Sequence, residues 1–390
     1  MATSDPVELL KQLISIPSVN PMGRELSGPE YFETRLTEFL IQWCESLGVE
    51  YHLQEIAPGR SNLLAYWKNE NNPRTVLLDA HQDTVPVDGM TIAPFDPVEN
   101  DGRIYGRGAS DVKGGMASMM SAFARLVREQ PTDAASTILS CTIDEESTTL
   151  GILALADWLV SGECPVPRPD VAVIAEPTEL DVVVAHRGAI RWAIRTAGRA
   201  CHSSDPTQGE NAIYRMGQVL AQLERYAASL PARKPPHPLC GGSTFSVGRI
   251  GGGASVNTVP DECWIEIDRR IIPGEDAEEA RQEVIAELES LPFPVQHDEP
   301  WLVGYALADD CNQELSRQLL ESIERHAGQH KAVGVPYGTH ASRTGRVGIP
   351  SVVFGPGSIA QAHTKDEWIE AEQLKIAADV YFDFCCHYTG

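Results

Sequence analysis

The stretch Leu77-Leu78-Asp79-Ala80-His81-Gln82-Asp83-Thr84-Val85-Pro86 decides the fold. The apolar run that starts at Thr75 predicts a buried strand, which ends in a histidine followed two residues later by an aspartate. Residues two apart in a strand face the same side, so Asp83 can reach the ring of His81. Such a carboxylate fixes the tautomer of a metal-bound histidine and raises its basicity. A His-x-Asp pair alone predicts only a polar strand end, but the rest of the chain favours a metal site.

Three further predicted strands lead to residues of the same kind. Residues 136–142 predict a strand, and the apolar runs at residues 171–175 and 351–354 predict two further buried strands. They are followed, respectively, by Asp144-Glu145-Glu146, by Glu176 and by a loop that contains His363. A short acidic run is usually solvated, yet these acids directly follow core strands. Ligands in open α/β sheets bind at the carboxyl ends of strands, so we expect these side chains to meet His81.

A glycine-rich segment places one more aspartate near this edge. Gly108, Gly114 and Gly115 flank Asp111 closely in Gly106-Arg-Gly-Ala-Ser-Asp111-Val-Lys-Gly-Gly115, and a helix is predicted from Met116 to about Arg128. Glycine lets the backbone approach another group closely, although a plain turn also uses it. The segment matches neither the dinucleotide-binding nor the P-loop pattern, which disfavours a phosphate site.

The donor set indicates the metal. His81, Asp111, Glu146, Glu176 and His363 offer two imidazoles and three carboxylates. Nitrogen and oxygen ligands without thiolate suit zinc, cobalt or manganese. Five ligands exceed what one four-coordinate ion uses with a position left open. Two ions that share one bridging carboxylate would use all five.

Composition limits the partners and the compartment. A chain of 390 residues predicts two domains. The formal charge of -24 disfavours nucleic acid and anionic membranes as partners. Nine cysteines without regular spacing predict reduced thiols, and neither a secretory signal nor a membrane-spanning run is visible. We expect a cytoplasmic enzyme.

Taken in order, these motifs resemble the M20 family of dizinc metallopeptidases and amidohydrolases. The resemblance rests on five elements that run over nearly the whole chain: His81-x-Asp83, Asp111-Val-Lys-Gly-Gly115, Asp144-Glu145-Glu146, Glu176-Pro-Thr178 and Ala362-His363. It implies two Zn²⁺ ions per chain, with Co²⁺ or Mn²⁺ as substitutes. Asp111 would bridge the ions; His81 and Glu176 would complete one site, and Glu146 and His363 the other. Glu145 would be the general base, and Asp83 would support His81.

The resemblance also implies the domain organisation. A zinc-exopeptidase-like α/β catalytic domain with a mostly parallel sheet would comprise residues 1–186 and 298–390. Residues 187–297 would form an inserted α+β dimerisation (lid) domain, with helices expected near 210–227 and 276–290, and the chain would form a homodimer. His202 would stabilise the oxyanion in the partner's active site, although its segment also suits a helix-capping turn. Asn257, Arg270, Gly355 and Ser358 would bind substrate.

The implied reaction is hydrolysis of the amide bond of an N-acyl-amino acid or dipeptide. The expected substrate is N-acetyl-L-ornithine, which would yield L-ornithine and acetate in arginine biosynthesis. Desuccinylation of succinyl-diaminopimelate and a dipeptidase or carboxypeptidase activity are alternatives, as is a non-catalytic, metal-dependent amino-acid-binding protein. One departure weakens the ornithine assignment: His340 stands where family members usually have an acid.

Overall fold

The computed structural model describes residues 3–390, so residues 1 and 2 of the predicted catalytic segment lie outside the described residues. The chain separates into two compact units. The first holds the described residues up to Val184 together with Asp309–Val333 and Thr339–Gly390, and the second holds Ala185–Ala308 and Gly334–Gly338. The sequence-based divisions fell after residues 186 and 297. The second unit extends further because β13 (Leu302–Gly304) pairs with β9 (Gly188–Ala197).

A large sheet forms the centre of the first unit. Its strand order is β1-β2-β6-β3-β7-β15-β8-β14. The strands are β1 (Glu50–Ala57), β2 (Arg60–Trp67), β3 (Thr75–His81), β6 (Ser136–Thr142), β7 (Val171–Ile174), β8 (Val182–His186), β14 (Ala332–Val335) and β15 (Ser351–Val353). The central strands β6, β3, β7 and β15 run parallel, whereas β1, β2 and β8 pair antiparallel. This parallel centre confirms the predicted α/β class with a mostly parallel sheet.

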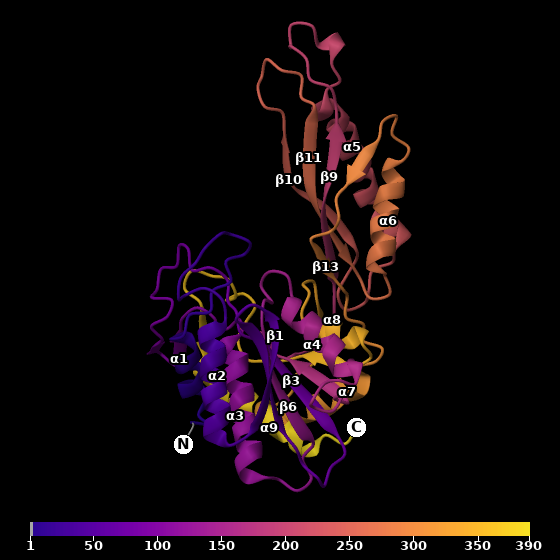
Figure 1. Cartoon of the computed structure of the whole chain (residues 1–390). Coiled ribbons are helices and arrows are strands. Elements are labelled where there is room, and N and C mark those ends of the chain that lie inside the picture. The colour runs from indigo at the N-terminus through magenta and orange to yellow at the C-terminus, as the bar shows by residue number, and fades with distance from the viewer. Residues whose placement is uncertain (1–2) are drawn as a thin grey trace. The chain divides into compact units, whose positions relative to one another are not determined.

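Helices cover this sheet (Figure 1). They are α1 (Pro6–Ile14), α2 (Thr34–Leu47), α3 (Lys113–Glu129), α4 (Leu150–Ser161), α7 (Gln313–Ala327), α8 (Ala341–Arg346) and α9 (Ala371–His387). On β3, Val76, Leu78 and Ala80 join the apolar cluster formed with α1, α2, α3 and α9. The alternating residues Asp79 and His81 therefore face the other side of the sheet.

A small sheet pairs two segments of the first unit that are far apart in the sequence. Its order is β16-β5-β4, where β4 is Val98–Asn100, β5 is Arg103–Tyr105 and β16 is Trp368–Glu370. The antiparallel pairing of β16 with β5 brings the segment after His363 to the segment before Asp111.

The second unit is an antiparallel sheet with helices packed on it. Its strands β10 (Thr244–Gly252), β11 (Glu262–Ile271), β9 and β12 (Val295–His297) lie in that order. Helices α5 (Ala212–Arg233) and α6 (Ala277–Leu288) pack against them, and a short 3₁₀ turn, η1, spans Pro206–Gln208. Along β11, alternate residues such as Ile265 and Ile267 are buried beneath these helices. Within residues 3–390, no helix is long and apolar enough to cross a membrane.

Candidate metal centre

Four parallel strands deliver the predicted ligands to one edge of the large sheet. His81 ends β3, and Glu146 lies on the loop that follows β6. Glu176 follows β7, and His363 lies on the loop after β15. Because β6, β3, β7 and β15 are neighbours and parallel, their carboxyl ends lie at the same edge.

The structure brings Asp111 into the middle of this group. His81 Nε2 lies 3.1 Å from Asp111 Oδ1, and His363 Nε2 lies 3.3 Å from Asp111 Oδ2. Glu146 Oε2 lies 3.2 Å from His363 Nε2. Ligand atoms of His81, Asp111 and Glu146 all fall within 4.8 Å of one another, a spacing that could hold a metal ion. Each oxygen of the Asp111 carboxylate thus faces a different imidazole, as a bridging ligand would.

Charge is crowded at this edge. Burial raises the pKa of Glu145 to about 8 and that of Glu146 to about 7, and the charge of Asp111 contributes to both. Glu176 is also buried, and desolvation together with Asp111 and Glu145 raises its pKa. Burial opposes ionisation of Asp111 too, but hydrogen bonds from His363 and His81 lower its pKa. Carboxylates crowded in this way favour a bound cation, which would offset their repulsion.

The protonation pattern of His81 fits a metal ligand. Its Nδ1 lies 3.0 Å from the carbonyl oxygen of Asp83 and 3.5 Å from Asp83 Oδ1. Both neighbours accept hydrogen bonds, so Nδ1 is held by Asp83, and Nε2, which lies against Asp111, is the ring nitrogen left to bind a metal. In addition, the buried Oε1 atom of Glu146 has no hydrogen-bond partner among the described residues. These donors fit a divalent cation with nitrogen and oxygen ligands.

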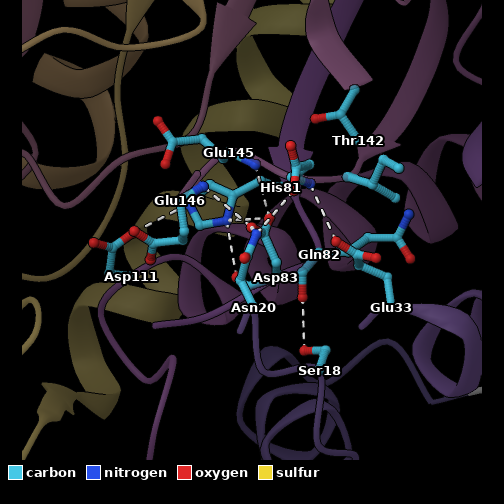
Figure 2. A network of polar contacts seen from close by, with 12 residues as sticks. Ser18, Asn20, Glu33, His81, Gln82, Asp83, Asp111, Thr142, Glu145 and Glu146 are labelled. Carbon is cyan, nitrogen blue, oxygen red and sulfur yellow. Dashed lines mark hydrogen bonds and ion pairs between the residues drawn. The ribbon is translucent and has the colours of Figure 1, made fainter. Parts of the chain in front are cut away.

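Asp83 also holds the loop that carries the two glutamates (Figure 2). Its Oδ1 accepts the backbone N–H of Glu145 at 3.0 Å, and its Oδ2 accepts that of Glu146 at 3.1 Å. The Asn20 side chain donates to Asp83 at 2.9 Å and to Asp144 at 3.0 Å. One buried aspartate therefore fixes both His81 and the neighbouring acidic loop.

A second acidic group, Glu33 with Asp83 and Asp144, lies behind this loop. Arg60 pairs with two of its three carboxylates: the guanidinium donates to both carboxylate oxygens of Glu33 at 2.7 Å and to Asp144 at 3.0 Å. Asp144 has a left-handed backbone with a φ of 64°. Sequence reasoning missed Asn20, Glu33 and Arg60, because nothing in their local sequence shows that they meet this loop.

Gly355 and Ser358 lie next to the end of β7. The Gly355 amide donates to Thr178 Oγ1 at 3.1 Å, and Ser358 forms a β-bridge with Thr178. A Cβ atom at Gly355 would lie 2.7 Å from the carbonyl oxygen of Glu176. Only glycine therefore allows this loop to approach the Glu176 backbone so closely.

The remaining predicted residues belong to the second unit. His202 is exposed in a turn, where its Nδ1 accepts the Ser204 amide at 3.2 Å. The Ser203 amide donates to the carbonyl of Asn257 at 3.0 Å, so His202 and Asn257 lie on adjoining segments. Arg270 pairs with Asp268 at 2.7 Å on β11. The adjacent Arg269 points to the other face, where it is buried against Glu275 at 2.8 Å.

His340 occupies a buried polar site beside β3. Its Nδ1 lies 3.1 Å from Asp79 Oδ2, and its ring meets that of His81 edge-on, with centroids 6.2 Å apart. Ser140 donates to Asp79 Oδ1 at 2.5 Å. Asp79 therefore accepts the Nδ1–H of His340, which shows how this chain accommodates a histidine at that position.

Known proteins share this architecture. The M20 family metallo-carboxypeptidase Sso-CP2 from Sulfolobus solfataricus matches with a TM-score of 0.76 and 18% identity, over 98% of both chains. A dinuclear metal-binding peptidase of the M20 family from Bacillus subtilis matches with a TM-score of 0.67 and 16% identity, over 98% of this chain and 96% of that one. At these identities the likeness shows the fold.

Sequence comparison gives the family. The acetylornithine deacetylase of Erwinia tasmaniensis is 32% identical over 400 residues and covers 98% of each chain. That of Photorhabdus laumondii subsp. laumondii is 33% identical over 399 residues, with 97% of each chain covered. The profile of peptidase family M20/M25/M40 matches residues 77–387. The chain therefore belongs to peptidase family M20/M25/M40 and is a metal-dependent peptidase or amidohydrolase of that family.

Proposed function

We propose that the protein is a dizinc hydrolase that removes the acetyl group from N-acetyl-L-ornithine. The observation that carries the metal centre is the position of Asp111, whose two carboxylate oxygens face His81 and His363 separately. Asp111 would bridge two Zn²⁺ ions, His81 and Glu176 would hold one of them, and Glu146 and His363 the other. When bound, the ions act as Lewis acids that polarise an amide carbonyl and acidify water.

Glu145 is the general base in this proposal. Its neighbour Glu146 contacts His363, which leaves Glu145 free for proton transfer. Burial raises the pKa of Glu145, which makes its carboxylate a better proton acceptor than that of an exposed glutamate. Glu145 takes a proton from the attacking water and delivers it to the leaving amine. Asp83 holds the Glu145 amide in place throughout.

Four residues are assigned to substrate recognition. Gly355 and Ser358 line the substrate pocket beside β7. Arg270 and Asn257 hold the α-carboxylate, for which an arginine fork is an apt partner. Two relatives that span nearly the whole chain are named acetylornithine deacetylase, which supports acetylornithine as the substrate.

Two further assignments complete the proposal. The protein is a homodimer through its second unit, and His202 reaches the partner's oxyanion. The exposed side chains of Ile213, Tyr214, Ile250 and Val256 support an interface there, as does the edge strand β10. The enzyme works in the cytoplasm, a location supported by its nine free cysteines.

The test is acetate release by the zinc-loaded protein from N-acetyl-L-ornithine, compared with succinyl-diaminopimelate and simple dipeptides. We expect ornithine formation by the wild type and a loss of at least 100-fold in kcat for E145Q. Turnover retained by E145Q would remove Glu145 from the mechanism. Preferred hydrolysis of succinyl-diaminopimelate or of dipeptides would overturn the acetylornithine assignment. Binding of these compounds without hydrolysis of any of them would indicate a metal-dependent binding protein. Sedimentation of the active protein as a monomer would exclude the trans role of His202.

A further inference from the structure

Glu367 is a completely buried carboxylate that accepts four hydrogen bonds from one segment. Its Oε2 accepts Arg107 Nη1 at 2.7 Å and the Gly108 amide at 3.0 Å. Its Oε1 accepts the amides of Ser110 at 2.9 Å and Asp111 at 3.0 Å. One buried carboxylate thus accepts hydrogen bonds from three backbone amides and one guanidinium.

This contact joins the two segments that carry opposite sides of the candidate centre. Glu367 lies four residues after His363, and it binds the backbone of Asp111 directly. Two further hydrogen bonds join the same two segments. The Gly106 amide donates to the Glu367 carbonyl at 3.0 Å, and Ser110 Oγ donates to the Trp368 carbonyl at 2.8 Å. Because Asp111 Oδ2 faces His363 Nε2, a shift between the segments changes the separation of these two ligand atoms.

We propose that Glu367 is a positioning residue that sets the Asp111–His363 separation and thereby the affinity of the zinc position formed with Glu146. This inference rests on the proposed dizinc centre. Only an ionised carboxylate offers enough lone pairs for four donors. A carboxamide has one acceptor oxygen, and its NH₂ group would face donors, which leaves buried N–H groups unpaired.

The matched variants are E367Q and E370Q. Glu370 lies in the same segment, but its half-exposed carboxylate pairs with Arg103 at 2.9 Å, away from the Asp111 amide. Zinc is measured by competition with a chromophoric chelator, alongside zinc content after dialysis. We expect E370Q to bind two ions, each with the same affinity as in the wild type. In E367Q one of the two ions binds about 10- to 100-fold more weakly, as for other groups that orient metal ligands.

Folding is checked by circular dichroism and gel filtration. If E367Q does not fold, E367D is measured in its place. Its shorter side chain keeps the charge beside Arg107 but withdraws it from the three amides. We expect one ion to bind about tenfold more weakly in E367D. Wild-type zinc affinities in a folded E367Q, or in E367D when E367Q is unfolded, would overturn the inference and leave the dizinc centre standing. A lower melting temperature with both ions held normally would also overturn it. Fewer than two ions in the wild type would instead remove the proposed centre, and this inference with it.

Discussion

Asp83 accepts the backbone N–H of Glu145 at 3.0 Å through the same carboxylate oxygen that lies 3.5 Å from the His81 ring. The position of the proposed base is therefore coupled to the position of a proposed ligand. Asp83 is fully buried, and the hydrogen bond with His81 offsets its burial and lowers its pKa. It remains an ionised acceptor for its neighbours.

The first prediction concerns this coupling. In D83N, one acceptor oxygen is replaced by an NH₂ group that faces the amide of Glu145 or Glu146. We expect a 10- to 100-fold loss in kcat and weaker zinc binding, since removal of groups that orient metal ligands has effects of about this size. Steady-state kinetics and chelator competition measure both quantities. D88N is the control because Asp88 forms an exposed pair with Arg24, and normal values in D83N would contradict the coupling.

The second prediction concerns Arg60. R60M leaves the buried carboxylates of Glu33 and Asp144 without their cation, and removal of one partner from a buried ion pair costs about 3–5 kcal/mol. Urea unfolding of the wild type and of R60M measures this difference in the free energy of unfolding. K68A breaks only the exposed pair with Glu70 and is expected to leave the free energy of unfolding nearly unchanged. Equal losses in the two variants would show that Arg60 does not neutralise this group.

The sequence predicted the parts of the site that depend on strand ends. The strands before His81, Glu146 and Glu176, which are β3, β6 and β7, are buried along their whole length, as strands in a parallel sheet covered on both faces are. Parallel neighbours end at one edge, which is why these residues were expected together, whereas the roles assigned to them stay predictions.

Local sequence could not reveal contacts set by tertiary packing. Arg60 reaches Asp144 across 84 residues, and Glu367 reaches Asp111 across 256. Each is an ordinary charged residue in its own segment. Similarly, the helix expected near 210–227 continues to Arg233 as α5, because Leu230 is buried in the second core.

The third prediction concerns acid stability of the second unit. His297 Nδ1 accepts the Trp192 indole N–H at 3.2 Å, and burial, with Arg281 nearby, lowers the pKa of His297 to about 4. The unfolded histidine, with a pKa near 6.5, binds a proton that the folded one does not. Stability is therefore lost as the pH falls from about 6.5 to about 4, by at most about 1.4 kcal/mol per pH unit.

The variant H297Q keeps an acceptor for Trp192 but cannot titrate. We expect its free energy of unfolding, measured in urea at pH 7 and pH 5, to change less over this interval than that of the wild type. H387Q is the control, because His387 is exposed near the end of α9. An identical pH dependence for H297Q and wild type would show that His297 is protonated in the folded protein.

The last prediction tests why this chain carries a histidine at position 340. H340D introduces the acid that the family resemblance led us to expect at this position, but here it places a second buried carboxylate beside Asp79, whose Oδ2 lies 3.1 Å from the present His340 ring. Repulsion raises the pKa of the introduced carboxyl above its unfolded value, so its protonation relieves the cost at low pH. We expect a loss of about 2 kcal/mol in unfolding free energy at pH 8 and a smaller loss at pH 5. H340N retains an N–H donor toward Asp79 and should lose less at pH 8. A wild-type stability for H340D at pH 8 would show that Asp79 does not require a donor, and the histidine would then have to be explained by contact with substrate.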